Sequence, residues 1–161
     1  MSTLPYRRNV GAVLFNRDGR VLVARRADLP NAEGPAGGWQ LPQGGIDLEE
    51  DPRAAVLREL AEEIGTDRAE IIGEHPEWLS YDLPAELVGV ALGGRYRGQT
   101  QRWFALRFTG EDSDIRLDAD PDPEFDAWRW ADLTELPALA VDFTRPIYRI
   151  LAASFARFTE P

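Results

Sequence analysis

The sequence predicts an α/β fold in which a mixed β-sheet lies between layers of helices. Two observations predict it: short apolar runs recur along the chain, and they are interleaved with two substantial helical segments. With 161 residues, of which 43% are hydrophobic, the chain is large enough to bury a core as one domain over 1–161. The sequence has no cysteine, which excludes disulfides and thiolate chemistry.

The N-terminal part predicts a hairpin. Residues 9–15 and 21–25 read as strands, and the turn-forming residues Asn16–Gly19 join them. Residues 27–38, rich in Pro, Gly and Ala, are expected to form a loop that could gate or narrow a neighbouring site.

The remaining strands are expected later in the chain, at 70–74, 78–81, 101–108 and 126–130. Residues 132–136 suggest a helical turn. Residues 146–158 have apolar positions at i, i+3, i+4 and i+7, so they are expected to form a closing helix packed on the sheet.

The central helix has clear boundaries. Asp51 is a good N-cap, Pro52 suits the first helical position, and Gly65 is a stop signal, which predicts a helix of about thirteen residues. Its spacing places the apolar residues on one side: Leu57, Leu60, Ala61 and Ile64.

Three carboxylates, Glu59, Glu62 and Glu63, are expected roughly opposite that apolar side. They repel one another, and two of them lie in the last turn, where the helix dipole disfavours negative charge. A solvated surface is the ordinary explanation, but a hard divalent cation would also remove the penalty. The turn at 40–45, just upstream, can bring backbone carbonyls close to such a cation.

Residues 44–66 resemble the Nudix hydrolase signature, which is Gly, five residues, Glu, seven residues, then Arg-Glu-apolar-any-Glu-Glu-any-Gly-apolar. Eight positions match in register: Gly44, Glu50, Arg58, Glu59, Leu60, Glu62, Glu63 and Gly65. Thr66, where the family has an aliphatic residue, is the one departure. The resemblance implies a Nudix-type α/β/α sandwich over the whole chain.

The composition favours metal-assisted hydrolysis of a phosphate-containing substrate. The chain has a single histidine, His75, which we expect on a surface loop, so carboxylates are the available ligands. Carboxylates without imidazole or thiolate suit Mg²⁺, with Mn²⁺ possible. Such ions neutralise phosphate charge and activate water. The resemblance narrows the substrate to a nucleoside diphosphate linked to another moiety.

The resemblance also implies roles for individual residues. The expected metal ligands are the Gly44 carbonyl and the carboxylates of Glu59, Glu62, Glu63 and, from outside the signature, Glu124. The expected catalytic residues are Glu59, which orients or deprotonates the water, with Glu62 and Arg58. Arg58 is expected to position the helix acid, and Glu50 to support the site from outside it.

Other segments, at 6–11, 39–45, 98–104 and 123–130, resemble one branch of the family, the bacterial RNA 5′-pyrophosphohydrolases and dinucleoside polyphosphate hydrolases. In that branch arginines grip the phosphate chain and an aromatic ring stacks on a base. The matching substrate-binding residues are Arg7, Arg25, Arg26, Gln43, Phe143 and Arg145. Phe143 could instead anchor the last helix in the core.

The net charge of −10 argues against a protein that holds nucleic acid through its general phosphate field, so we expect no DNA binding. We also expect no membrane segment and a cytoplasmic location. The expected substrate is an RNA 5′ end, a dinucleoside polyphosphate, or both. The alternatives are a house-cleaning hydrolase of small nucleotides and a non-catalytic nucleotide-binding Nudix module. A protein partner and the oligomeric state stay open.

Overall fold

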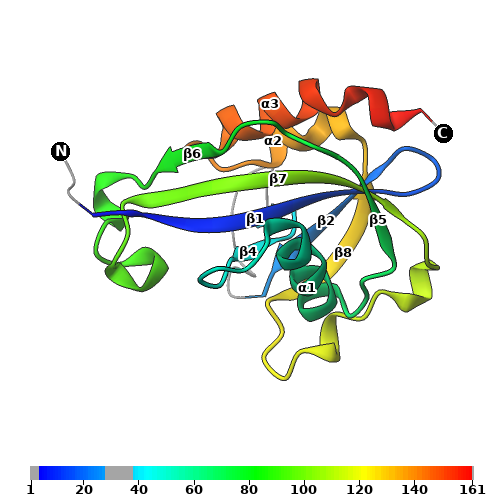
Figure 1. Ribbon diagram of the computed structural model, residues 1–161, viewed down its shortest axis with the longest axis horizontal. Coiled ribbons are helices and arrows are strands. Elements are labelled where there is room, and N and C mark those ends of the chain that lie inside the picture. The colour runs from blue at the N-terminus through cyan, green and yellow to red at the C-terminus, as the bar shows by residue number, and fades with distance from the viewer. Residues whose placement is uncertain (1–3, 28–37, 161) are drawn as a thin grey trace.

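The computed structural model describes residues 4–27 and 38–160, so most of the loop expected at 27–38 lies outside the described residues. An eight-stranded sheet runs through the molecule (Figure 1). Its main strand order is β3-β2-β1-β7-β5, while β4 pairs with β1, β6 with β7 and β8 with β2. The strands are β1 Tyr6–Phe15, β2 Val21–Arg26, β3 Trp39–Gln40, β4 Gln43–Gly45, β5 Ala69–Glu74, β6 Leu79–Asp82, β7 Gly98–Phe108 and β8 Phe125–Ala131.

The sheet is mixed, as the sequence predicts. The two long central strands, β1 and β7, run parallel, with Tyr6 opposite Gly98 and Phe15 opposite Arg107. The other pairings are antiparallel. This parallel pairing joins segments about ninety positions apart, and it brings the start of the chain beside residues 98–104.

Helices cover both faces of the sheet, which confirms the predicted α/β/α sandwich (Figure 1). On one face, Val10, Ala12 and Leu14 of β1 pack with the helix α1, Pro52–Ile64. On the other, Val13 and Phe15 pack with helices α2, Leu136–Leu139, and α3, Arg145–Ser154. Because both faces are buried, the strand has a continuous apolar run rather than a simple alternation.

Helix α1 begins and ends where the sequence predicts. The Asp51 side chain accepts a hydrogen bond from the Ala54 backbone N–H at 3.2 Å, and Gly65 has the left-handed φ of 76°. The predicted faces of the helix were partly wrong. Ala61 is exposed, whereas Glu63 is buried among the core residues. The reason is that the 3₁₀ segment Leu117–Ala119 packs on this helix and Glu124 lies beside Glu63, which helical spacing does not reveal.

Other differences are local. Residues 40–45, expected as a turn, instead include the end of the short strand β3 and the whole of β4. The closing helix ends at Ser154 because the chain continues as a 3₁₀ helix, Ala156–Thr159. Two more 3₁₀ helices, Ala85–Leu87 and Ala91–Gly94, occupy the region before β7. Among the described residues, no helix is long and apolar enough to cross a membrane.

Candidate active site

The last two turns of α1 carry the carboxylates that the sequence singles out. Glu63 is only 5% exposed, and neither of its carboxylate oxygens has a hydrogen-bond donor among the described residues. Burial raises the pKa of Glu63 well above its usual value, and the neighbouring carboxylates of Glu124 and Glu59 raise it further. A buried carboxylate without a compensating partner destabilises the fold, so stability does not explain why a glutamate occupies this position.

Glu59 lies one turn earlier on the helix and is also largely buried. Burial raises the pKa of Glu59, the Arg58 charge lowers it, and the Glu62 charge raises it. The Glu59 carboxylate packs directly against Gly44 of β4, in the space that a Cβ at Gly44 would fill. Glycine at this position therefore lets the strand backbone approach the helix acid.

Arg58 holds the acids around it in place. Its Nε donates to Glu50 Oε2 at 2.7 Å and its Nη2 to Glu50 Oε1 at 2.8 Å, a bidentate pair. Its Nη1 lies 3.1 Å from Glu59 and 3.2 Å from Glu62, and its Nη2 also donates to the Gly45 carbonyl at 3.0 Å. The pairing with Arg58 lowers the pKa of Glu50 to about 2. This geometry agrees with the positioning role expected for Arg58.

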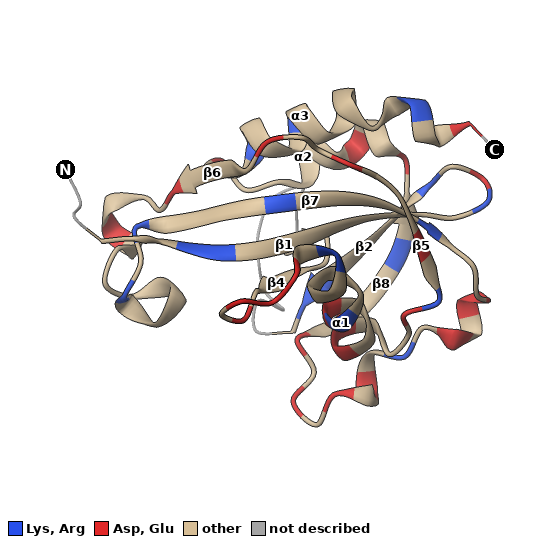
Figure 2. Ribbon diagram, viewed as in Figure 1, with Lys and Arg blue, Asp and Glu red and all other residues tan. Residues whose placement is uncertain are grey.

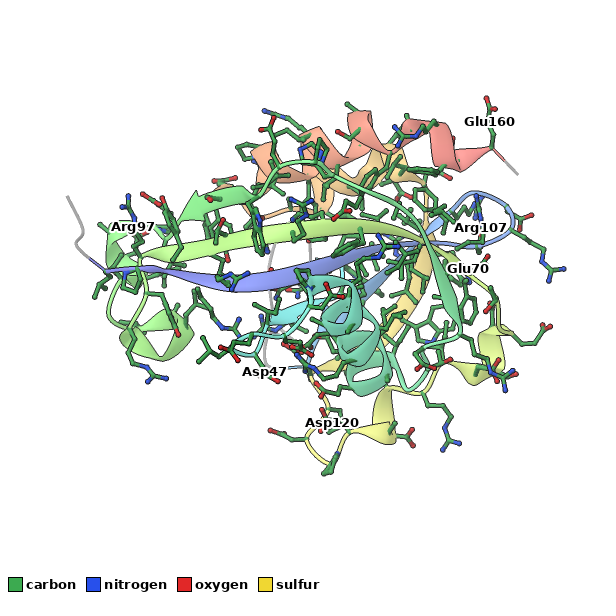
Figure 3. The ribbon with its side chains drawn as sticks, viewed as in Figure 1. Asp47, Glu70, Arg97, Arg107, Asp120 and Glu160 are labelled. Atoms are coloured by element: carbon green, nitrogen blue, oxygen red, sulfur yellow. The ribbon has the colours of Figure 1, made fainter. Side chains whose placement is uncertain are left out.

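Glu124 precedes β8 and approaches the same helix. Its carboxylate acts on the pKa of both Glu63 and Glu59, which places it beside them. Glu124 also lines a cavity of about 360 Å³ with Arg26 and Asp120. The loops that flank α1 are marked by Asp47 and Asp120 in Figure 3. The acid expected from outside the signature therefore lies where it could join the helix carboxylates.

These residues fit a divalent cation in their chemistry. The donors are oxygen atoms, and the carboxylate of Glu63 has no partner among the described residues to offset its charge. The side chains of the described residues do not already form a closed set of three metal ligands. Glu59 and Glu62 are instead paired with Arg58, which therefore competes with a cation for them.

A second group of predicted residues lines a cavity of about 240 Å³ on the α3 face of the sheet, the Phe143 cavity. Arg26, Gln43 and Phe143 all contribute to it. The Phe143 ring lines this cavity and packs on Tyr81 of β6 with a centroid distance of 5.5 Å. This arrangement could hold a base and the phosphates next to it.

A buried polar row joins this cavity to β1, and sequence reasoning missed it. Asn9, Gln99 and Gln101 are at most 4% exposed. Asn9 Nδ2 donates to Gln99 Oε1 at 2.9 Å and also to Gln43 Oε1, while Gln99 Nε2 donates to Tyr81 at 2.6 Å. The sequence pattern that could have revealed this row is the placement of polar residues at alternate positions of a strand that is otherwise buried on both faces.

The other predicted arginines differ in position. Arg7 donates to Gln99 Oε1 at 2.9 Å and lies close to Gly45, near the carboxylates. Arg25 instead pairs with Asp126 at 2.8 Å. Arg145 directs Nε and Nη2 at backbone carbonyls of 137 and 140, and Nη1 at Asp142. The structure thus brings Arg7 and Arg26 to the cavities, and it engages Arg25 and Arg145 elsewhere.

The predicted surface position of His75 also needs correction. It is half-buried rather than on the open surface, because its Nδ1 lies 3.3 Å from Ser154 Oγ at the end of α3.

The fold and the site define the class of protein. The NUDIX domain family matches residues 5–151, and the chain belongs to the Nudix family. Among solved structures, the MutT protein from Methanosarcina mazei Go1 superposes with a TM-score of 0.66 at 20% identity, covering 96% of this chain and 98% of that one. The Ap4A hydrolase of C. elegans superposes with a TM-score of 0.61 at 19% identity, covering 94% and 98%. Both show the shared fold.

Curated relatives cover nearly the whole chain. The RNA pyrophosphohydrolase of Gluconacetobacter diazotrophicus is 68% identical over 160 residues, which are 98% of this chain and 96% of that protein. The RNA pyrophosphohydrolase of Acidiphilium cryptum is 64% identical, covering 99% and 95%. The prediction of a Nudix hydrolase similar to the RNA pyrophosphohydrolase branch is confirmed. Nudix hydrolases generally need divalent metal cations and act on nucleotide substrates.

Proposed function

We propose that this chain, as one Nudix domain, is a metal-dependent pyrophosphohydrolase. Its substrates are RNA 5′-triphosphate ends, dinucleoside polyphosphates of the diadenosine tetraphosphate type, or both. Water attacks a phosphorus, one P–O bond of the phosphate chain breaks, and the two products share the phosphates. The names of the close relatives support the RNA substrate, and their similarity extends over the whole chain.

One observation carries the proposal: the Glu63 carboxylate is buried next to Glu59 and Glu124, and no donor from residues 4–27 or 38–160 reaches it. We infer that these three, with Glu62 and the Gly44 carbonyl, hold Mg²⁺, or Mn²⁺ in its place. The bound ion would neutralise phosphate charge and lower the pKa of water. Glu59 is the proposed base, because its carboxylate packs against Gly44 and lies beside Glu63.

The substrate is held by other residues of the chain. Arg7 and Arg26 would pair with phosphate oxygens, because both line cavities next to the carboxylates. Phe143, packed on Tyr81, would stack on a base, and Gln43 lines the same cavity. Arg58 positions Glu59, and Glu50 in turn fixes Arg58. Arg25 is ion-paired with Asp126, and Arg145 donates to a neighbouring backbone carbonyl. These two residues are therefore less available to bind substrate.

Substrate choice is tested by comparing kcat/KM on triphosphorylated RNA, diadenosine tetraphosphate, nucleoside triphosphates and nucleotide sugars. The expected result is a clear preference for the first two. Comparable values on every substrate would point to a house-cleaning hydrolase. No turnover of any of them in the presence of Mg²⁺ or Mn²⁺ would point to a non-catalytic module.

The catalytic assignment is tested by substitution. Glu59→Gln should lower kcat about 10²- to 10⁴-fold, the usual loss when a positioned base is removed. Glu77→Gln is the matched control, because Glu77 is an exposed acid away from the site. Chelation of the metal should abolish product formation. Unchanged turnover by the Glu59 variant at saturating metal would exclude the proposed base.

We also propose a cytoplasmic location, supported by the absence of cysteine from the sequence and by the RNA substrate. The net charge of −10 supports the absence of DNA binding.

A further inference from the structure

A cavity of about 470 Å³ lies on the α1 side of the sheet and reaches Glu59. It shares no lining residue with the Phe143 cavity. Its walls come from the start of β1, the turn after β4 and the segment just before β7. Its volume falls in the range of small-molecule sites, about 300–1,000 Å³. We call it the Tyr96 cavity, after the aromatic residue on the β7 side.

Three side chains that line this cavity are not explained by the fold. Within 4–27 and 38–160, the Tyr96 side chain has no hydrogen-bond, ion-pair or ring partner. Leu48 is 92% exposed, the largest exposed fraction among the large hydrophobic residues. Among the described residues, the Arg8 guanidinium has no ion pair or hydrogen bond, and it lies over the face of Trp78, 5.0 Å from the ring centroid. An aromatic ring, an apolar side chain and a cation without an ion pair thus border one cavity.

This combination suits a nucleoside. Bases stack on aromatic rings and on the guanidinium planes of arginines, and apolar side chains cover their edges. Trp78 holds Arg8 in place, so little conformational entropy is lost when Arg8 meets a ligand. The acids of the cavity, Asp47 and Glu59, lie on its α1 side, where Arg58 is 3.9 Å and 3.1 Å from them.

Charge is divided in the same way in the structure. Figure 2 shows basic positions along β1 and β7 beside α1, while acidic positions gather on α1 and on the loops below it. In Figure 3, Asp47 lies near the start of α1 and Arg97 lies at the far end of the sheet, where its guanidinium covers the Tyr6 ring at 4.7 Å. Tyr6 is therefore already covered on one side by a guanidinium, whereas no guanidinium of the described residues lies over the Tyr96 ring.

Arg7 connects the two cavities. It lines the Tyr96 cavity, and its Nη1 donates at 2.9 Å to Gln99, which lines the Phe143 cavity. A phosphate chain that passes Arg7 and the carboxylates would therefore have one cavity at each end. A triphosphorylated RNA has nucleosides on only one side of its phosphate chain. A dinucleoside polyphosphate has one on each side.

We propose that the Tyr96 cavity is a second nucleoside subsite, in which Tyr96 and Arg8 sandwich the base and Leu48 covers its edge. It takes the nucleoside at the far end of a dinucleoside polyphosphate, while the Phe143 cavity takes the other. The proposal rests on the proposed function, because the carboxylates between the two cavities are taken as the place of hydrolysis.

The test compares diadenosine tetraphosphate with adenosine 5′-tetraphosphate, which has the same phosphate chain and lacks one nucleoside, and with triphosphorylated RNA. Tyr96→Ala and Arg8→Ala should each raise KM for diadenosine tetraphosphate about tenfold, the expected loss of one stacking contact, and leave kcat unchanged. Both variants should leave the other two substrates unaffected. Tyr96→Phe keeps the ring and should behave as wild type. Arg95→Ala, at an exposed arginine that does not line the cavity, is the matched control.

Equal losses on all three substrates, or none on any, would overturn the subsite. A loss confined to RNA would also overturn it, because the cavity would then take a nucleotide of the RNA chain. Binding of diadenosine tetraphosphate, measured by calorimetry, separates this proposal from the proposed function. If RNA is hydrolysed and binding is indifferent to Tyr96→Ala, only the subsite fails. If nothing is hydrolysed but binding still depends on Tyr96, only the function fails.

Discussion

Glu63 carries a cost in stability that its position explains. The carboxylate is enclosed by the core and by Glu124, and its pKa is raised well above the usual value by burial. The folded protein therefore binds the Glu63 proton more tightly than the unfolded chain does. That contribution is complete below the unfolded pKa of about 4.5 and is lost as the pH rises through the folded pKa. The metal-free fold should weaken with rising pH for this reason.

Glu63→Gln is expected to raise the Tm of the metal-free protein at pH 8 and to flatten the fall of Tm between pH 5 and pH 8, because the amide cannot ionise. Tm is measured with a chelator present. Glu77→Gln, at an exposed acid, should leave the pH profile of wild type. If the Glu63 variant showed the same dependence of Tm on pH as wild type, burial would not raise the pKa of Glu63 as we infer.

The ion pair of Arg58 with Glu50 has the opposite effect on the pH dependence of stability. Their bidentate pair holds the pKa of Glu50 at about 2, so its stabilising effect is present above about pH 4.5 and is lost as the pH falls through about 2.

Arg58→Lys keeps the charge and loses the fork that orients Glu59. We expect kcat to fall about 10- to 100-fold with little change in KM, the range found for residues that orient metal ligands. Arg53→Lys, on the same helix, should have no such effect. An Arg58→Lys variant with the kcat of wild type would show that Arg58 contributes only charge.

At the scale of elements, the helix α1 and the strand β4 determine each other's position. Glu59 packs against Gly44, and the helix ends at Gly65, whose φ is 76°. A Cβ at Gly65 would also lie 2.6 Å from the Arg116 carbonyl oxygen. The end of the helix, and with it the direction of the last carboxylates, depends on this glycine.

Gly65→Ala should destabilise the protein by more than about 1–2 kcal/mol, the usual cost of left-handed backbone for a residue with a Cβ, because the close approach to Arg116 adds to it. Gly89→Ala is the matched control: its φ is 87°, and nothing lies within 4 Å of the added Cβ. The free energy of unfolding in urea measures both. Equal losses of unfolding free energy in the two variants would mean that the close approach to Arg116 adds nothing to the destabilisation.

At the scale of the whole molecule, charge sets how the substrate is held. The net charge is −10, and the described arginines near the carboxylates form a small local group rather than a long basic track (Figure 2). A long RNA therefore gains little from its later phosphates. Binding should depend on the triphosphate and the first nucleotides.

RNAs of about five and about fifty nucleotides, both triphosphorylated, should have similar KM values, since extra affinity would require further phosphate contacts. For the same reason log K should fall with log salt at a slope between about −1.4 and about −2.1, which is roughly −0.7 for each of two or three neutralised phosphates. Steady-state kinetics at several salt concentrations measure both quantities. A KM that falls tenfold with RNA length would reveal a basic track that the described surface does not show.

The sequence by itself determined the helix α1, its two ends and the carboxylates it carries. These features depend on contacts within a few residues, such as the Asp51 cap and the Gly65 stop, so local spacing was enough. Most strand positions followed from apolar runs for the same reason, whereas β3 and β4 lie in a segment expected as a turn. The family match agrees with what that spacing indicated.

Only the tertiary structure decided how distant segments meet. The parallel pairing of β1 with β7 places Arg7 beside Gln99, and the segment before β8 encloses Glu63. It also turned Arg145 toward local carbonyls and left Tyr96 facing a second cavity. These outcomes depend on contacts between residues far apart in the chain, whose loop-closure entropy and burial no local pattern records. The sequence thus identified the carboxylates, and the fold determined which of them is buried and which cavities surround them.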